Sequence, residues 1–292
     1  MQGTRLADCG RVISRLHCIA MSVREIPLVG DVSEGVVRVG ATVRRPMRPS
    51  SPSVHALLRH LESAGFDRAP RVLGIDERGR AILTYVEGVV PAHPLPAYAV
   101  SDEALTTLAR LLRRFHDAAA SFNPPPGAVW ENGSAPEGPA ELVGHCDVTP
   151  ANVVFRERPG AGLLPYALID FDLARPTTRL FDVVTTLRHW APLADPLDRD
   201  RLQRSLDAAA RVRLFCDAYG LPARDRLLLV ETARVRFGRS YAVMRDRART
   251  LGGGWARMWD GGAGGRIRRA AAWLDANEDA IQRRLLGDDP IS

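Results

Sequence analysis

Four polar residues stand at fixed spacing around two apolar segments in the middle of the chain. Asp147 precedes Asn152 by five residues, and Asp170 and Asp172 follow after a further eighteen and twenty. A carboxylate can accept the proton of a hydroxyl group, and carboxylate and amide oxygens are the hard ligands that Mg²⁺ prefers. Phosphoryl transfer from a nucleotide needs both functions in one site. The spacing therefore predicts Asp147 as the base and Asn152 and Asp170 as metal ligands, with Asp172 assisting at the metal or bracing the loop.

The elements that must position these residues form a predicted β-hairpin. Residues 153–155 are predicted as one short strand and residues 166–169 as its partner, with a Pro- and Gly-containing turn at 158–162 between them. Such a hairpin would bring Asn152 and Asp170 close together in space.

The segment HCDVTPANVVF, followed by ALIDFDLARPTTRLFDVV, resembles the catalytic segment of the aminoglycoside phosphotransferase family, which includes choline-kinase-like small-molecule kinases. Its H-x-D-x-x-x-x-N and I-D-F-D motifs are close to the paired motifs of protein kinases. The resemblance covers about residues 26–195. It implies a two-lobed, protein-kinase-like α+β fold, with a small antiparallel-sheet N-lobe and a mainly helical C-lobe. It also implies transfer of the γ-phosphate of ATP or GTP, with Mg²⁺, to a small-molecule hydroxyl.

Three further residues of this segment take expected roles from the resemblance. His145 should orient the catalytic loop by hydrogen bonding and not by proton transfer. Asp182 either braces that loop from the start of a helix, as its family equivalent does, or is a simple helix cap. Cys146 stands where protein kinases carry an arginine that binds an activation-loop phosphate, so we expect no such switch. Each residue alone also has a structural interpretation, but the ordered set favours the catalytic one.

The resemblance implies that residues 23–88 form the nucleotide-binding N-lobe. Families of this fold place a lysine on the third strand to bind phosphate, but this chain contains no lysine. Arg44 is therefore the candidate cation, with Arg45 second, and strand alternation sends one of the two to solvent. Tyr85, Val86 and Glu87 match the linker between the lobes, where the nucleotide base would pair with the backbone. The predicted strands span residues 24–28, 35–39, 42–45, 71–76 and 80–85.

A helix predicted at residues 54–64 departs from the family pattern. The glutamate that pairs with the strand cation is expected near Val54 or His55, and neither is acidic. Either Glu62 replaces that glutamate or the pair is missing. The loop at residues 30–35 could cover the nucleotide phosphates, and an ordinary hairpin loop is an equally good interpretation.

Residues 89–292 are assigned to the C-lobe, which would hold the catalytic loop and a helical acceptor-binding region. Residues 1–22 are treated as an extension that could be disordered. Four tryptophans, at positions 190, 255, 259 and 273, are expected in the core rather than against a ligand. Helices are predicted at residues 102–119, 202–219, 224–249 and 267–286.

Composition excludes several classes of function. The formal net charge is +6, but the arginines are spread beside acids instead of forming a basic arm, which argues against a nucleic-acid partner. No apolar run reaches transmembrane length, so no membrane association is expected. The four cysteines form no C-x-x-C pair, which is typical of reduced thiols in a cytoplasmic protein. An excess of arginine after residue 191 mildly disfavours a polycationic aminoglycoside acceptor.

Two alternatives to a small-molecule kinase stay open at this stage. The missing lysine and helix glutamate favour a nucleotide-binding pseudokinase or regulatory module, whereas the intact Asp147, Asn152 and Asp170 oppose it. A metal hydrolase that uses residues 145–147 is weak, because adjacent residues in one loop do not easily all face one ion. The sequence identifies neither the acceptor nor the oligomeric state.

Overall fold

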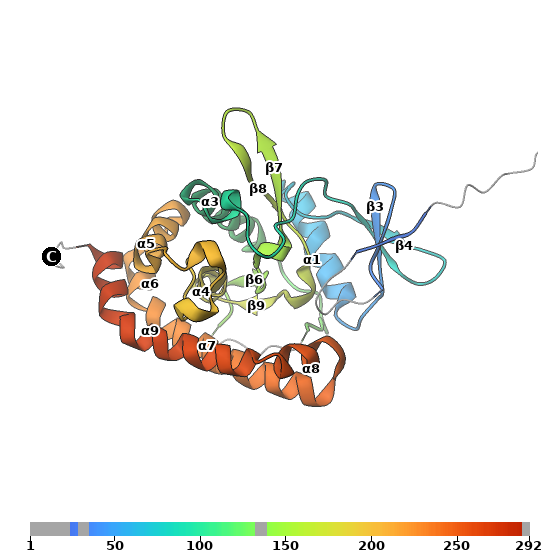
Figure 1. Cartoon of the computed structure of the whole chain (residues 1–292). Coiled ribbons are helices and arrows are strands. Elements are labelled where there is room, and N and C mark those ends of the chain that lie inside the picture. Colours follow the sequence, from blue (N-terminus) through green and yellow to red (C-terminus); the bar gives the residue numbers. More distant parts are fainter. Residues whose placement is uncertain (1–23, 29–34, 132–138, 288–292) are drawn as a thin grey trace, which may run out of the picture.

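A computed structural model describes residues 24–28, 35–131 and 139–287. The expected extension at residues 1–22 and residues 30–34 of the first predicted loop lie outside the described residues. The described chain forms two lobes, with the sheet at one end and most helices at the other (Figure 1). The expected protein-kinase-like α+β fold is confirmed.

The N-lobe is an antiparallel sheet of five strands in the order β1-β2-β3-β5-β4. Gly40 lies in the two-residue turn between β2 and β3 with φ of 60°, a conformation that glycine adopts without steric cost. The strands are β1 (Ile26–Pro27), β2 (Val37–Val39), β3 (Thr42–Arg45), β4 (Val72–Ile75) and β5 (Ala81–Thr84). The five predicted strands thus all occur: β3 has the predicted bounds, and the other four are shorter than expected, β1 most of all.

One helix, α1 (Ser51–Ser63), accompanies this sheet. It begins three residues earlier than predicted because Pro52 fits the first helical turn, where its missing N–H leaves no hydrogen bond unmade. Leu57 and Leu61 are fully buried on the face that packs toward the C-lobe helix α3 (Asp102–Ala119). The helix therefore joins the two lobes through one continuous apolar core.

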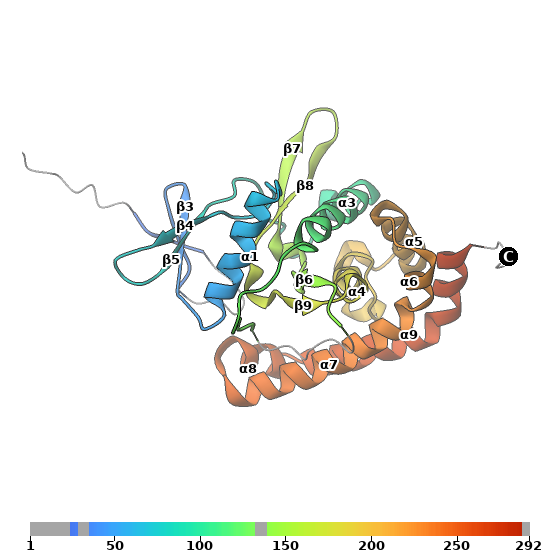
Figure 2. The same cartoon turned by 180° about the vertical axis from the view of Figure 1, so that it is seen from behind.

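The C-lobe consists of helices around two short β-ribbons, one of which pairs β6 (Leu142–Gly144) with β9 (Arg175–Thr177). The helix α7 lies beside α9 along one edge of the lobe, as views from both sides show (Figure 1 and Figure 2). The remaining helices, besides α1 and α3, are α2 (Ala97–Val100), α4 (Arg179–Trp190), α5 (Ala208–Tyr219), α6 (Ala223–Leu227), α7 (Leu229–Thr250), α8 (Gly253–Asp260) and α9 (Ala263–Leu286).

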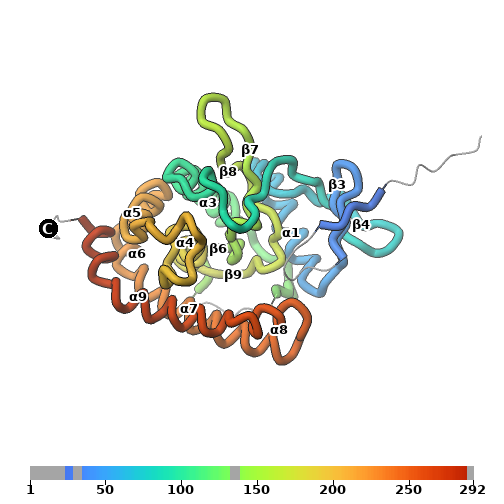
Figure 3. The backbone as a smooth tube through the Cα atoms, in the orientation of Figure 1, coloured from blue at the N-terminus to red at the C-terminus, as the bar shows by residue number. Residues whose placement is uncertain are grey.

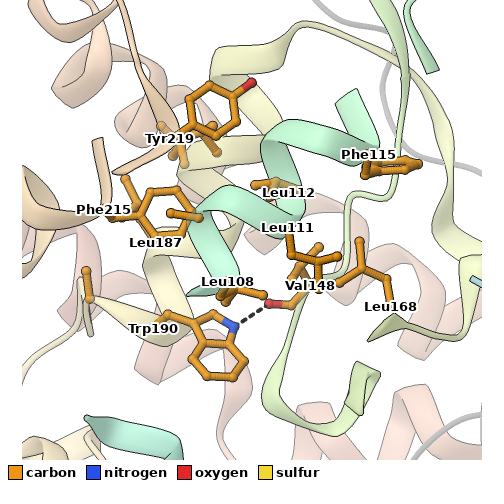
Figure 4. Packing of buried hydrophobic residues seen from close by; sticks show 14 of the residues in the cluster. Leu108, Leu111, Leu112, Phe115, Val148, Leu168, Leu187, Trp190, Phe215 and Tyr219 are labelled. Atoms are coloured by element: carbon orange, nitrogen blue, oxygen red, sulfur yellow. Dashed lines mark hydrogen bonds between the residues drawn. The ribbon is translucent and has the colours of Figure 1, made fainter. Parts of the chain in front are cut away.

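The C-lobe core is built on α3, whose apolar residues recur at helical spacing. Leu108 and Leu112 pack with Leu187 of α4 and Phe215 of α5 (Figure 4). Ser101 caps α3 by accepting a hydrogen bond from the N–H of Ala104, as the sequence suggests. The tube view shows α3 and α4 beside the central ribbons, with α5 farther out against α3 (Figure 3).

Three helix predictions need correction. The helix expected at 267–286 begins four residues earlier, at Ala263. The helix expected at 202–219 begins only at Ala208, because the Asp207 side chain caps it by accepting from the N–H of Ala210. The helix expected at 224–249 is divided into α6 and α7 at Leu228. The segment that follows, Gly253–Asp260, is a helix that the glycine run concealed.

Candidate active site

The catalytic hairpin consists of β7 (Val153–Arg158) and β8 (Gly162–Leu168), with strands longer than predicted. Val153 lies opposite Leu168, and the N–H of Ile169 donates to the carbonyl of Asn152 at 3.0 Å. Asn152 and Asp170 therefore emerge side by side from one end of the hairpin. The predicted juxtaposition of these two residues is confirmed.

Two residues beside this end carry backbone strain. Cys146 and Asp170 have φ of 60° and 61°, and they are the non-glycine residues with positive φ in the described chain. Such conformations cost about 1–3 kcal/mol each and persist where the surrounding structure enforces them, often at active sites. Both strained residues line the cleft between the lobes, which has a volume of about 680 Å³.

Asp147 lies on the catalytic loop before the hairpin and faces the cleft. Its carboxylate accepts a hydrogen bond from Asn152 Nδ2 at 2.8 Å, and the same amide nitrogen donates to the Asp147 carbonyl at 2.9 Å. Burial, together with the nearby negative charge of Asp170, raises the pKa of Asp147 to about 7. A carboxyl with its pKa near neutrality has the proton affinity suited to a general base.

Asp182 braces the catalytic loop from inside α4. Its fully buried carboxylate accepts hydrogen bonds from the backbone N–H of His145 at 2.8 Å and of Cys146 at 2.9 Å, and a ring nitrogen of His116 lies 3.0 Å away. The helix cap is instead Thr178, which accepts from the N–H of Phe181. Of the two interpretations open for Asp182, the brace is the one observed.

His145 is fully buried and is not among the residues that line the cleft. Burial lowers its pKa, so the imidazole is neutral, and its Nε2 donates to the carbonyl of Ile169 at 2.9 Å. The ring also packs against Phe171, with the centroids 4.5 Å apart. These contacts join the catalytic loop to the segment that carries Asp170, which fits an orienting role.

The strand cation in the cleft is Arg45 and not Arg44, the first candidate from sequence. Arg45 Nη2 lies 2.9 Å from Asp170 Oδ1 and 2.6 Å from Asp172 Oδ2. Arg44 points to the opposite face of β3, where it contacts Asp76 at 3.7 Å. Successive residues of a strand face opposite sides of the sheet, so only one of the two can reach the cleft.

No glutamate of α1 accompanies this cation among the described residues. His55 lies in a small pocket together with Arg45 and both aspartates of the D-F-D motif. Glu62 instead contacts Arg71 at 3.3 Å, near the exposed end of the helix. The usual cation–glutamate pair is therefore missing, and the two aspartates take the place of the glutamate as partners of Arg45.

The linker lies where the resemblance implies. Tyr85 and Val86 line the cleft, whereas the Glu87 side chain is 63% exposed and pairs with Arg38 at 2.6 Å. Gly88 follows with φ of 145°, and a Cβ there would lie 2.4 Å from the carbonyl oxygen of Phe155. The linker backbone thus approaches β7 more closely than a side chain would permit.

Asn152, Asp170 and Asp172 carry the amide and carboxylate oxygens that Mg²⁺ prefers as ligands. No cluster of three or more His, Cys, Asp or Glu side chains suited to a metal occurs among the described residues. Mg²⁺ commonly takes one or two carboxylates and completes its shell with phosphate oxygens and water, so a small protein ligand set is expected for it. Asn152 commits its amide nitrogen to Asp147, which leaves its oxygen to serve as the ligand.

Several cleft residues were not foreseen from the sequence. Arg175, Arg188 and Arg236 line the cleft from β9, α4 and α7, respectively. Trp255, expected in the core, also lines it. The excess of arginine after residue 191 includes Arg236 but neither Arg175 nor Arg188, so it did not point to these residues as a set.

Comparison with known proteins assigns the chain to a family. The model of the phosphotransferase enzyme family matches residues 28–132 and 128–215. The chain belongs to this family. A trifolitoxin immunity protein from Rhizobium leguminosarum bv. trifolii is 39% identical over 209 residues, which is 69% of this chain and 76% of that protein.

Three solved structures share the fold of this phosphotransferase family member. The GDP complex of aminoglycoside 2'-phosphotransferase-IIIa has a TM-score of 0.54 and 14% identity, covering 89% of this chain and 94% of that chain. A choline/ethanolamine kinase family protein from Mesorhizobium loti has a TM-score of 0.54 and 16% identity, and the match covers 89% of this chain and 91% of that chain. Amicoumacin kinase, in complex with AMP-PNP, Ca²⁺ and Ami, has a TM-score of 0.55 and 10% identity, covering 86% and 88%.

The helices of this family member give no sign of a membrane span. Within residues 24–28, 35–131 and 139–287, no helix combines the length and the apolar character that crossing a bilayer requires.

Proposed function

We propose that this protein transfers the γ-phosphoryl group of ATP or GTP to a hydroxyl group of a small molecule. The observation that carries the proposal is the convergence of Asp147, Asn152 and Asp170 at one end of the catalytic hairpin, held by Asp182. A base, two hard oxygen ligands and a nearby guanidinium are the parts that this reaction needs.

In the proposed step, the acceptor oxygen forms a bond to the γ-phosphorus while the bond from that phosphorus to the β–γ bridging oxygen breaks. The acceptor proton moves to the Asp147 carboxylate, and the nucleoside diphosphate leaves with the bridging oxygen. Asn152 fixes the Asp147 carboxylate through the hydrogen bond of 2.8 Å, so that the base is oriented before the acceptor arrives.

Asn152, Asp170 and Asp172 would hold Mg²⁺, which when bound neutralises charge on the phosphates. Arg45 contacts both aspartates and is close enough to serve the phosphates as a planar donor fork. Tyr85 and Val86 would hold the nucleotide base at the linker. GDP and AMP-PNP are bound in two structures of the same fold, which supports a nucleotide as the phosphoryl donor.

The name of the Rhizobium relative adds one class of acceptor to the search. That protein is described as giving immunity to trifolitoxin. Phosphorylation of a toxin or antibiotic hydroxyl is a chemical route to immunity, so such molecules belong in an acceptor panel beside ordinary metabolites.

A second candidate function is nucleotide binding without transfer. The observation that favours it is the direct pairing of Arg45 with Asp170 and Asp172, in the absence of a helix glutamate to hold the cation away from them. If Arg45 kept this position in the nucleotide complex, it would compete with Mg²⁺ for the carboxylates.

The test is nucleotide turnover with Mg²⁺ against hydroxylated small molecules, with nucleotide binding measured separately. We expect acceptor-stimulated turnover that falls by about 10²–10⁴-fold in Asp147→Asn, the usual contribution of a general base. Asp246→Asn is the matched control, because Asp246 is exposed on α7 and does not line the cleft. Nucleotide binding with no turnover on any acceptor supports the second candidate, and loss of binding altogether contradicts both.

A further inference from the structure

The half of the cleft that faces α4, α7, α8 and α9 is strongly basic. Among the described residues that line the whole cleft there are eight arginines and four carboxylates. Arg45 and Arg48 are paired with Asp170 and Asp172 on the side of the N-lobe. On the other side, the described carboxylates that line the cleft are Asp147 and Glu131.

Three of these arginines, Arg175, Arg188 and Arg236, form what we call the arginine cluster. They reach the cleft from three different elements, and none of them forms a salt bridge with a carboxylate of the described residues. Asp147 and Asp182 are the carboxylates whose charge acts on Arg236. Asp182 is already committed to the backbone of the catalytic loop and to His116. Asp198, whose charge acts on Arg188, is paired with Arg269 at 2.6 Å.

Individual donor atoms of the cluster are buried without a hydrogen-bond partner. Arg175 Nε and Arg188 Nη1 are two of the three such side-chain atoms in the described chain. The aromatic rings of Phe181 and Phe237 lie near these guanidiniums, at 5.5 Å and 4.9 Å, and satisfy them only in part. Buried polar groups are nearly always hydrogen-bonded, so guanidiniums that line the cleft and keep buried donors without a protein partner favour an anionic ligand beside them.

The cluster is also costly to the protein on its own. Burial, followed by repulsion from the neighbouring arginines, lowers the pKa of Arg188 to about 10 and lowers that of Arg236. Arg236 is anchored by donating from Nε to Thr185 Oγ1 at 3.0 Å, which holds its charge beside the catalytic loop. Gathering like charges in a partly dry site destabilises the folded state unless an anion compensates them.

Apolar side chains also line this half of the cleft, on the same helices that carry several of its arginines. They are Val243 and Met244 of α7, Trp255 and Met258 of α8, and Ile267 of α9. An acceptor that fills this space would place an apolar portion against α8 and its polar groups toward the arginine cluster and Asp147.

We propose that the acceptor is an anionic alcohol, whose carboxylate or phosphate group is bound by Arg188 and Arg236 while its hydroxyl faces Asp147. This inference rests on the proposed phosphoryl transfer, and it narrows the substrate class of the same site. It runs against polycationic or quaternary-amine acceptors, which would meet repulsion from Arg175, Arg188 and Arg236.

The experiment compares hydroxy acids with their uncharged amides. The panel pairs glycerate with glyceramide and 3-phenyllactate with 3-phenyllactamide, and includes glycerol 3-phosphate beside glycerol, with kanamycin and choline as cationic alcohols. Binding is measured by thermal shift in the presence of a non-hydrolysable nucleotide, and turnover is measured with Mg²⁺ and ATP. We expect the anionic members to bind at least ten times more tightly than their uncharged partners, and the phosphate and carboxylate arms identify which anion fits.

The variants Arg188→Gln and Arg236→Gln test the assigned residues. We expect each to raise the KM or Kd of the anionic members by at least tenfold and to change that of the amides by less than twofold. Removing one charge should also raise the melting temperature of the ligand-free protein, whereas loss of a merely structural arginine would lower it. Arg245→Gln is the control, because Arg245 lies on α7 but not in the cleft, and it should change none of these values.

The outcomes separate this inference from the proposed function. Anion-selective binding without turnover would support the anionic acceptor and contradict phosphoryl transfer. Turnover confined to neutral or cationic alcohols would support phosphoryl transfer and contradict the anionic acceptor. Equal binding of acids and amides, no binding by any anionic member, or weakened nucleotide binding as the main effect of both variants would overturn the anionic-acceptor site.

Discussion

The guanidinium of Arg45 reaches from the N-lobe sheet to the catalytic hairpin, where its Nη2 lies 2.9 Å from Asp170 Oδ1. The adjacent residue of the same strand, Arg44, points away and contacts Asp76. Two arginines with the same chemistry and adjacent positions thus occupy opposite faces of one strand. Substituting each arginine in turn therefore compares the same chemical change inside and outside the cleft.

We expect Arg45→Ala to lower kcat/KM for the nucleotide by about 10²–10³-fold, the usual cost of removing one charged donor from a transferring group. Arg44→Ala should change the same quantity by less than threefold, because its side chain lies outside the cleft. Steady-state turnover with varied nucleotide measures both. Equal losses in the two variants would contradict the assignment of Arg45 to the phosphates.

The contrast between these arginines shows what the sequence can and cannot predict. Strand alternation requires one arginine of the pair to face the cleft, but it does not say which, because both faces of a small sheet bear polar residues. The hairpin that joins Asn152 to Asp170 was predictable, since the two strands and their turn are local in sequence. Asn152 and Asp170 lie close together because they stand at the same end of this hairpin.

The arginine cluster, in contrast, could not be predicted from the sequence. Arg175, Arg188 and Arg236 come from a strand and two helices, and their meeting depends on how α4 and α7 pack. Arginine is common throughout this lysine-free chain, so no local pattern sets these three apart. The helix that carries Trp255 was missed for a related reason, since the glycine run before it suggests a loop.

The Asp182 brace predicts a large loss of stability in Asp182→Asn. The asparagine oxygen can replace one acceptor, but its amide group would face a backbone N–H that now has no acceptor. We expect the free energy of unfolding at pH 7 to fall by about 2–4 kcal/mol, as for other buried, hydrogen-bonded carboxylates. Urea denaturation measures this, with the exposed Asp246→Asn as control; a loss below about 0.5 kcal/mol would argue against the brace.

The same residue predicts how stability depends on pH. Burial alone would raise the pKa of Asp182, but hydrogen bonds from His116 and the catalytic loop outweigh it and hold that pKa below the ordinary value. A depressed pKa contributes stability that is fully present above the unfolded-state pKa of about 4 and is lost as the pH falls through the folded-state pKa. The difference in unfolding free energy between wild type and Asp182→Asn should therefore be constant from pH 7 to 5 and shrink below about pH 4. A difference that grows on acidification would contradict this sign.

Gly144 of β6 permits the close approach of β9 and α4 to the catalytic loop. A Cβ at this position would lie 2.6 Å from Thr177 Cγ2 and 2.7 Å from Asp182 Oδ2. We expect Gly144→Ala to destabilise the protein by about 1–3 kcal/mol, the usual cost of overpacking, and to lower kcat by displacing Asp182. Gly238→Ala is the control, because Gly238 lies inside α7 with nothing within 4 Å of the added Cβ. That control should stabilise the helix by up to about 1 kcal/mol, and thermal denaturation of both variants tests the opposite signs.

Trp190, the last residue of α4, also contacts the catalytic loop. Its Nε1 donates to the carbonyl of Val148 at 2.7 Å, next to the proposed base (Figure 4). Its ring stacks on Phe155 of the hairpin. Trp190→Phe would keep most of the packing but leave this buried carbonyl unpaired, which costs about 1–3 kcal/mol. We therefore expect a loss of stability in that range together with a several-fold fall in kcat at unchanged nucleotide affinity, because the freed loop positions Asp147 less well. Trp273→Phe, at a partly buried position away from the catalytic loop, should leave kcat unchanged, and an equal fall in kcat in that control would show that the effect does not pass through Val148.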